Sequence, residues 1–300
     1  MGSRTRMLLC GMKRYLDPKN DLVFKRIFGQ HPNVLRAFLN ALLPLEQHER
    51  IDSLEYLTPE QTPEIPVIKH TIVDVRCRDV SGRQFIVEMQ MQWTTAFLQR
   101  VLFNASRAYV HQLDRGEEYE LLQPVYGLSL LNDVYAPDHK GFYHHYKIVA
   151  VEEPDLEIKG LQLVFVELPK FEARGTDQAR ELWLRFLSET GKNEKAPVEI
   201  GEQGEEFRQA LSLAEEAAYT REELHAYDRY WDAVSTEKTL IAGKFREGLA
   251  EGQALGLRKG RAEGRALGRA EGRAEALAQA LASMVASGVP EAEARRMLGI

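Results

Sequence analysis

The chain has 300 residues, of which 44% are hydrophobic and 28% are charged. This composition is ordinary for a globular protein, and it excludes a disordered, collagen-like or disulfide-scaffold chain over most of the length. The formal net charge of −6 argues against general nucleic-acid binding through overall charge. The charge is uneven, because residues 151–230 hold 19 acidic and 10 basic residues, a balance of −9, which leaves +3 on the other 220 residues. A basic surface outside the middle of the chain is therefore compatible with the sequence.

Residues 1–11 (MGSRTRMLLCG) precede the first patterned segment, and we expect them to be a disordered or spurious extension. Their apolar run, MLLC, is too short for the core of a signal peptide. No apolar stretch of the chain is long enough to cross a membrane, so we expect no membrane partner. The two cysteines, Cys10 and Cys77, are far apart and imply no disulfide framework. We therefore expect a cytoplasmic protein.

The patterned sequence over residues 12–175 predicts a mixed β-sheet flanked by helices, which is an α/β domain. Apolar residues recur at helical spacing in three segments: 17–29, with Asp17 or Asn20 as N-cap, 31–43, with Asn33 as N-cap, and 96–113. Strands are predicted over 51–57, 68–79, 84–92, 124–132, 142–150 and 161–168. The strands 68–79 and 84–92 should form a hairpin about a turn at Ser81–Arg83.

The rest of the chain predicts a helical extension in two parts. Residues 176–240 have helical patterning, with a linker over 191–204. Residues 241–300 form a tail of Gly, Arg, Glu and Ala in which glycine recurs every fourth residue from Gly248 to Gly272. Each glycine costs a helix about 1 kcal/mol relative to alanine, so we expect either disorder or close packing with another copy, which would make the protein a homo-oligomer through the tail. The simpler interpretation is a low-complexity tail without chemistry of its own.

The hairpin holds the strongest candidate site. Asp74 lies in an otherwise apolar strand (IVDVRC), and Glu88 and Gln90 lie on one face of the next strand (VEMQMQ). A carboxylate in a central strand is costly unless it is paired or binds a cation. Two carboxylates that converge from adjacent strands would form a hard oxygen site suited to Mg²⁺.

The length of the hairpin loop tests this interpretation. A two-residue turn would place Asp74 on the apolar side with Met89, whereas an odd loop or a bulge places it on the face of Glu88 and Gln90. The alternative is structural: Asp74 is a satisfied buried carboxylate beside Arg76, and Glu88 is an exposed edge residue.

Three segments together resemble a known family: DPKNDLVFKRIFG (17–29), IVDVRCRDVSGRQFIVEMQ (72–90), and the Arg100…Tyr109 helix followed by YELLQPVYGLSLL. They are similar to the recombination-promoting nuclease and transposase family of the PD-(D/E)XK nuclease superfamily, and ELPKF (167–171) resembles the usual end of its domain. The resemblance covers roughly residues 12–175. It implies a restriction-endonuclease-like fold and a Mg²⁺-dependent DNA endonuclease, with Mn²⁺ as a substitute, that hydrolyses phosphodiester bonds and is associated with mobile DNA or recombination.

The resemblance also implies roles for individual residues. By position, Asp74 and Glu88 would hold the metal, and Gln90 stands where the superfamily has a lysine. Glutamine can orient water but adds no positive charge, and a catalytically inactive DNA-binding or protein-interaction module is the alternative function. Asp21, in the N-D-x-x-F-K motif, is either a third acidic group near the metal or a helix cap. Lys25 and Arg100 would contact phosphate, or would be ordinary solvated or paired charges.

Overall fold

The computed structural model describes residues 14–58, 60–61, 71–72, 74–113, 117–173, 175, 178–192 and 204–300. The extension predicted over 1–11 and most of the linker predicted over 191–204 lie outside these residues. The described chain forms two compact units, one that ends at Val234 and one that comprises Ser235–Ile300. The first unit contains the sheet.

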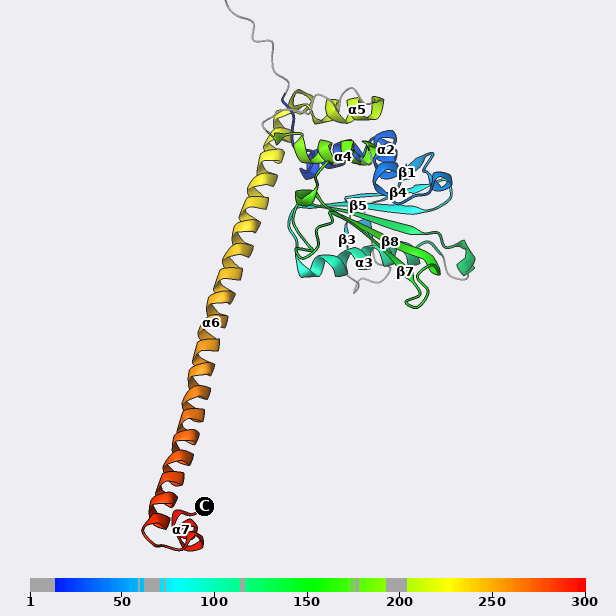
Figure 1. Ribbon diagram of the computed structural model, residues 1–300. Helices are drawn as coiled ribbons and strands as arrows, with labels where there is room; N and C mark the ends of the chain where they lie inside the picture. The colour runs from blue at the N-terminus through cyan, green and yellow to red at the C-terminus, as the bar shows by residue number, and fades with distance from the viewer. Residues whose placement is uncertain are drawn as a thin grey trace, which may run out of the picture. The chain divides into compact units, whose positions relative to one another are not determined.

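The first unit is built on a six-stranded mixed sheet in the order β1-β4-β5-β6-β8-β7 (Figure 1). Its strands are β1 (Leu54–Tyr56), β4 (Val75–Asp79), β5 (Gln84–Gln90), β6 (Val125–Leu131), β7 (Tyr143–Val149) and β8 (Glu157–Glu167). The three central strands, β5, β6 and β8, are parallel, and β4, β1 and β7 are antiparallel to their neighbours. The short strands β2 (Glu60–Gln61) and β3 (Thr71–Ile72) pair separately. The mixed sheet predicted from the sequence is confirmed.

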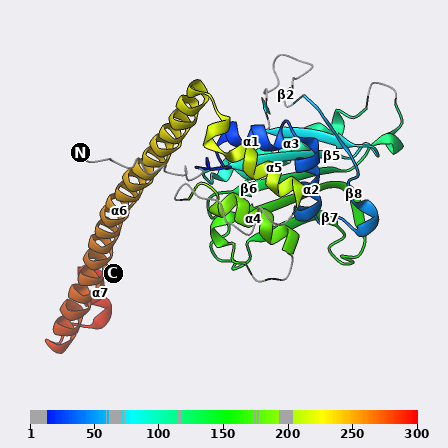
Figure 2. The ribbon, with the colours of Figure 1, turned by 90° about the horizontal axis from the view of Figure 1, so that it is seen from above.

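Helices cover both faces of this sheet (Figures 1 and 2). One face carries α1 (Asp21–Phe28), α2 (Pro32–Leu42), α4 (Gln178–Glu189) and α5 (Glu205–Ala214), and the other carries α3 (Thr95–Val110). Single 3₁₀ turns lie at η1 (Gln47–Glu49), η2 (Tyr119–Leu121), η3 (Leu168–Lys170) and η6 (Glu216–Ala218).

The helical region predicted from residue 176 shares a core with the sheet. Trp183 of α4 is 1% exposed, and its ring lies 5.4 Å from that of Phe38 in α2 and 4.2 Å from that of Phe207 in α5. The same core includes Val87 of β5 and Leu130 of β6. The predicted boundary at residue 175 therefore does not separate two cores.

The helices α1 and α2 begin in two different ways. The Asn20 side chain accepts a hydrogen bond from the Leu22 amide, so Asn20 is the N-cap of α1, and Gly29 follows its last residue. The predicted cap of α2 at Asn33 is wrong, because the helix begins earlier, with Pro32 in its first turn after His31. Proline suits that position, since its missing N–H would have no partner there.

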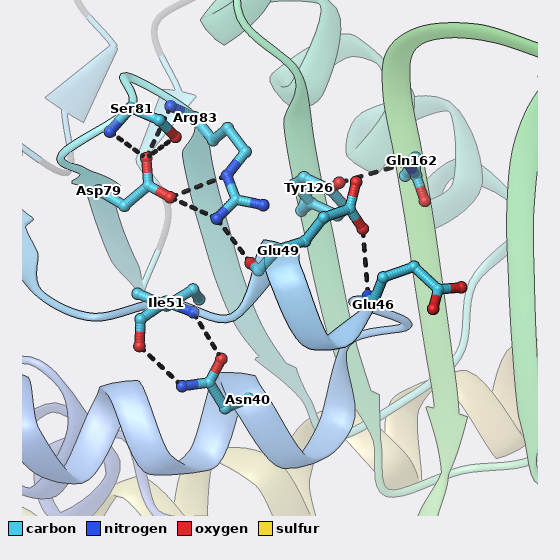
Figure 3. Close-up of polar contacts among 9 residues, drawn as sticks. All are labelled: Asn40, Glu46, Glu49, Ile51, Asp79, Ser81, Arg83, Tyr126 and Gln162. Atoms are coloured by element: carbon cyan, nitrogen blue, oxygen red, sulfur yellow. Dashed lines mark hydrogen bonds and ion pairs between the residues drawn. The ribbon is translucent and has the colours of Figure 1, made fainter.

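The β4–β5 turn fixes the register of the hairpin (Figure 3). Arg78 pairs with Gln84, and the Asp79 amide donates to the Arg83 carbonyl at 3.1 Å, which leaves the three-residue loop 80–82. Gly82 has φ of +86°, a conformation that favours glycine and is typical of such loops. Asp79 accepts hydrogen bonds from the Ser81 and Arg83 amides, both at 3.0 Å, and it forms an ion pair with the Arg83 guanidinium at 2.7 Å. The prediction of an odd loop is confirmed.

The second unit is helical. Helix α6 (Arg221–Ala286) begins in the first unit and continues through the glycine repeat, and α7 (Glu291–Leu298) follows it. The repeat is helical in the structure, so the expected disorder is not found, and association with another copy stays a prediction. No described helix is both long and apolar enough to span a membrane.

A chain truncated after Leu240 should have a free energy of unfolding within about 0.5 kcal/mol of that of the full chain, and therefore nearly the same thermal midpoint. It keeps Tyr227, whose hydroxyl accepts from the Asp17 amide, and Val234, whose carbonyl accepts from Gln92. Thermal unfolding followed by tryptophan fluorescence measures this, because every tryptophan of the chain precedes residue 240. A chain truncated after Thr220 is the control and should be less stable. A lower midpoint for the longer truncated chain would show that the first unit needs the tail.

Candidate active site

The candidate site lies where the central hairpin meets two helices. Asp74 immediately precedes β4, and Glu88 and Gln90 lie at the carboxyl end of β5. The paired residues of the hairpin have numbers that sum to 162, so the register continued by one step places Asp74 opposite Glu88. Opposed residues of antiparallel strands point to the same face, and the structure therefore brings the two predicted carboxylates together.

Asp74 is held by the backbone of the neighbouring strand. Its Oδ2 accepts a hydrogen bond from the Met89 amide at 2.7 Å. Burial raises the pKa of Asp74 above its ordinary value, and the negative charge of Asp21 raises it further. The Met89 bond and the positive charges of Lys25 and Arg100 act in the opposite direction, but burial dominates.

Glu88 is the more enclosed of the two carboxylates, with 8% of the residue exposed. Its Oε1 accepts a hydrogen bond at 2.9 Å from Nδ2 of Asn104, on α3. Burial raises the pKa of Glu88, and the charge of Asp74 adds to the effect. A neutral amide is thus the main compensation for this buried charge, so the site favours protonation of Glu88 or an added cation.

Gln90 is fixed at both ends of its amide. Nε2 donates to the Gln92 carbonyl at 2.6 Å, and Oε1 accepts from the Arg100 guanidinium at 2.6 Å. Arg100 is exposed on α3 and also lies over the ring of Phe97, with 5.0 Å from its Cζ to the ring centroid. The position that lacks a lysine is therefore in direct contact with an arginine from another element.

Asp21 and Lys25 form an ion pair with each other at 2.8 Å, and both side chains are nearly half exposed. Asp21 is not the helix cap, since Asn20 has that role. Asp21 acts on Asp74 through its charge. Among the described residues, however, no three or more His, Cys, Asp or Glu side chains are grouped so as to hold a metal.

Two details of the structural alternative for the carboxylates differ from the geometry. Arg76 donates to Gln84 at 2.8 Å, and Glu88 is buried instead of exposed at an edge. The donor set instead suits Mg²⁺, which binds through one or two carboxylates and keeps several waters. On the same Asn104 amide, the buried Oδ1 has no hydrogen-bond partner among the described residues.

A second buried carboxylate, Glu167, lies at the carboxyl end of β8, the same end of the parallel strands at which Gln90 lies. Gln90, Leu131 and Glu167 are aligned across three parallel strands, so Glu167 is two strand spacings, about 10 Å, from Gln90. Burial acts to raise the pKa of Glu167, but hydrogen bonds from Lys170, His144 and two backbone amides outweigh it and lower the pKa. The closest of these contacts joins His144 Nε2 and Glu167 Oε1 at 2.7 Å. Glu167 is thus a stably charged structural anchor, unlike Glu88.

Sequence reasoning predicted neither Asn104, which contacts Glu88, nor the structural cluster of Glu167 and His144. A signal for Asn104 was present, because it is four residues from Arg100 and therefore on the same face of the predicted helix. Glu167 ends an apolar strand, which is where a buried carboxylate needs partners. Those partners come from β7, from η3 and from two backbone amides of the loop before β7, and no sequence pattern identifies them together.

This geometry defines a class of protein. The mixed sheet between helices has the restriction-endonuclease-like fold, and its two facing carboxylates lie on adjacent segments, Asp74 just before β4 and Glu88 near the end of β5. Residues 18–243 match the family model of the PD-(D/E)XK nuclease family transposase, and the chain belongs to that family. The match includes α4, α5 and the start of α6, and the first two of these helices share the core described above. Searches of curated proteins and of solved structures found no match.

Replacing Glu88 with Gln should raise the free energy of unfolding near neutral pH by on the order of 1 kcal/mol. The amide keeps an acceptor for Asn104 but removes a buried charge. Because the folded-state pKa of Glu88 is raised, the folded wild type binds more protons than the unfolded chain above the ordinary carboxyl pKa, and its stability falls as the pH rises through that window.

Urea unfolding at several pH values measures this difference. The difference in free energy of unfolding between variant and wild type should be smallest near about pH 4 and should increase towards neutral pH. Glu55→Gln, which changes an exposed carboxylate on β1, is the matched control and should show no such trend. If the free-energy difference between Glu88→Gln and wild type does not change with pH, the raised pKa of Glu88 is contradicted.

Proposed function

We propose that the protein is a Mg²⁺-dependent endonuclease that hydrolyses phosphodiester bonds of DNA, with Mn²⁺ able to replace Mg²⁺, and that it acts in the movement or recombination of DNA. The observation that carries the proposal is the pair formed by the half-buried Asp74 and the buried Glu88 in a member of this nuclease family. Both carboxyl groups have raised pKa values and converge from adjacent strands, which is the arrangement that a divalent cation relieves.

In this proposal Asp74 and Glu88 hold the metal ion, and Asn104 orients Glu88 through its hydrogen bond. A bound magnesium ion would lower the pKa of a water molecule and neutralise charge on the scissile phosphate. The Met89 amide keeps the Asp74 carboxylate turned towards the site. Gln90, held at both ends of its amide, would position the attacking water or the phosphate.

In this proposal Arg100 supplies the positive charge that glutamine at position 90 lacks. A lysine there would add positive charge beside the phosphorus as the transition state forms. The guanidinium of Arg100 lies 2.6 Å from Gln90 Oε1 and acts to lower the pKa of both Asp74 and Glu88, so it acts electrostatically on the same place. We infer that Gln90 and Arg100 together replace the lysine, with Gln90 as the positioning group and Arg100 as the charge.

Asp74→Ala and Glu88→Ala should each reduce plasmid nicking by more than about 10³-fold while the fold is kept, because each removes charge that binds the metal. Nicking is measured over a range of Mg²⁺ concentrations, with circular dichroism to monitor folding and Glu55→Gln as the control. If Asp74→Ala cleaves as fast as wild type, the site is wrongly assigned. If wild type binds DNA without cleaving it, the inactive binding module is the better function.

Arg100→Gln should slow nicking by about 10²-fold, which is typical for loss of one electrostatic contact to the transition state. Gln90→Ala should have a smaller effect, since a neutral amide only positions a ligand. The double variant Gln90→Lys with Arg100→Gln should recover part of the lost rate, because it returns a positive charge to the same place. Failure of the lysine to recover any activity would contradict the shared role of Gln90 and Arg100.

A further inference from the structure

The second unit has a charged surface that the proposed catalytic site does not use. In α6, five arginines recur at positions that lie close together around the helix: Arg258, Arg261, Arg265, Arg269 and Arg273. With 3.6 residues per turn they fall within a sector of about 120° and span about 22 Å along the axis. All five residues are exposed. We call this surface the arginine face.

The sequence repeat keeps these arginines away from acidic partners within the helix. Ion pairs on a helix form between residues three or four positions apart. None of the five arginines has an acidic residue at either spacing, because in the four-residue repeat arginine and glutamate are two positions apart. Elsewhere in the unit, Lys244 pairs with Glu247 and Arg295 with Glu291, at those helical spacings of three and four. No ion pair of the arginine face occurs among the described residues.

The neighbouring acidic residues lie on the rest of the helix surface. Counted from Arg258, the glutamates Glu263, Glu271 and Glu275 fall at about 140°, 220° and 260°, outside the sector of the arginines. Residues 258–275 hold six basic and three acidic residues, a surplus of +3. Two copies packed along this segment would combine their surplus charge, whereas a polyanion would neutralise it.

We propose that the arginine face of α6 binds the phosphate backbone of duplex DNA, as a second DNA contact separate from the catalytic site. The proposal rests on the proposed function in one respect, that DNA is the partner. Duplex DNA has one negative charge for about every 1.7 Å of its axis, so a row of arginines of this length can meet several phosphates. Arginine is suited to such contacts because its guanidinium forms paired hydrogen bonds with phosphate oxygens. Contacts to the backbone alone would be independent of sequence.

The test is DNA binding by the full chain with all five arginines changed to Gln, which has a helix propensity similar to that of Arg. A fluorescein-labelled duplex of mixed sequence is titrated in EDTA, so that no cleavage occurs, at several salt concentrations. The variant should bind at least about tenfold more weakly at low salt, and the slope of log K against log salt should become shallower by about 4 to 5. Circular dichroism verifies that the helix is retained.

A matched control removes the same charge elsewhere in the unit. It changes five basic residues outside the arginine face to Gln: Lys238, Lys244, Arg246, Arg295 and Arg296. If it weakens binding as much as the first variant, the effect is one of net charge and the proposal is overturned. Equal binding by the first variant and wild type, or no binding by wild type, also overturns it.

Two further measurements separate this proposal from its alternatives. Plasmid nicking by the same proteins reports on the proposed function independently, since Asp74, Glu88 and Arg100 are unchanged in both variants. Sedimentation measures the oligomeric state: if the loss of the five arginines lowers the mass of the assembly but leaves DNA binding intact, the arginine face is an interface between copies and the proposal is wrong.

Discussion

The register of the β4–β5 hairpin is the constraint on which the site depends. The three-residue loop makes the paired residue numbers sum to an even value, and Asp74 then faces Glu88 instead of Met89. Asp79 holds that loop through its bonds to Ser81 and Arg83, and the Arg83 side chain also donates to the Glu49 carbonyl at 2.7 Å. A slip of one residue would send every side chain of the strand to the opposite face. The turn, which is remote from the chemistry, therefore determines whether the two carboxylates can meet.

The buried carboxylates Glu167 and Glu88 differ in how their charge is supported. Glu167 is fully buried, yet Lys170 and His144 keep its pKa low, so its negative charge stabilises the fold. Glu88 has mainly Asn104, a neutral donor, and its pKa is raised. A charge that the fold leaves poorly compensated is available to a ligand, whereas a compensated one is not. This difference distinguishes the catalytic candidate from the structural anchor.

The parts of the structure that could be predicted from sequence are those set by local pattern. The alternation of VEMQMQ predicted the faces of Glu88 and Gln90, and the glycine at position 82 is compatible with the odd loop that the predicted metal site required. What could not be predicted depends on contacts between distant segments. The shared core of Trp183 with Phe38 and Phe207 joins α4 to helices far away in sequence, so composition alone did not show that the domain continues beyond residue 175. The contact of Arg100 with Gln90 likewise requires α3 to lie against the end of β5.

The bonds around Glu167 have a consequence for how relatives of this chain can vary. Glu167 accepts from the Tyr135 amide at 3.0 Å, and Lys170 donates to the carbonyls of Ala136 and His139. Asp133, at the start of the same connection, accepts from the Trp93 amide just before α3. An insertion or deletion between Asp133 and His139 would break several of these bonds at once. Length changes between β6 and β7 should therefore accumulate after His139, and the earlier part of the connection should keep its length through evolution.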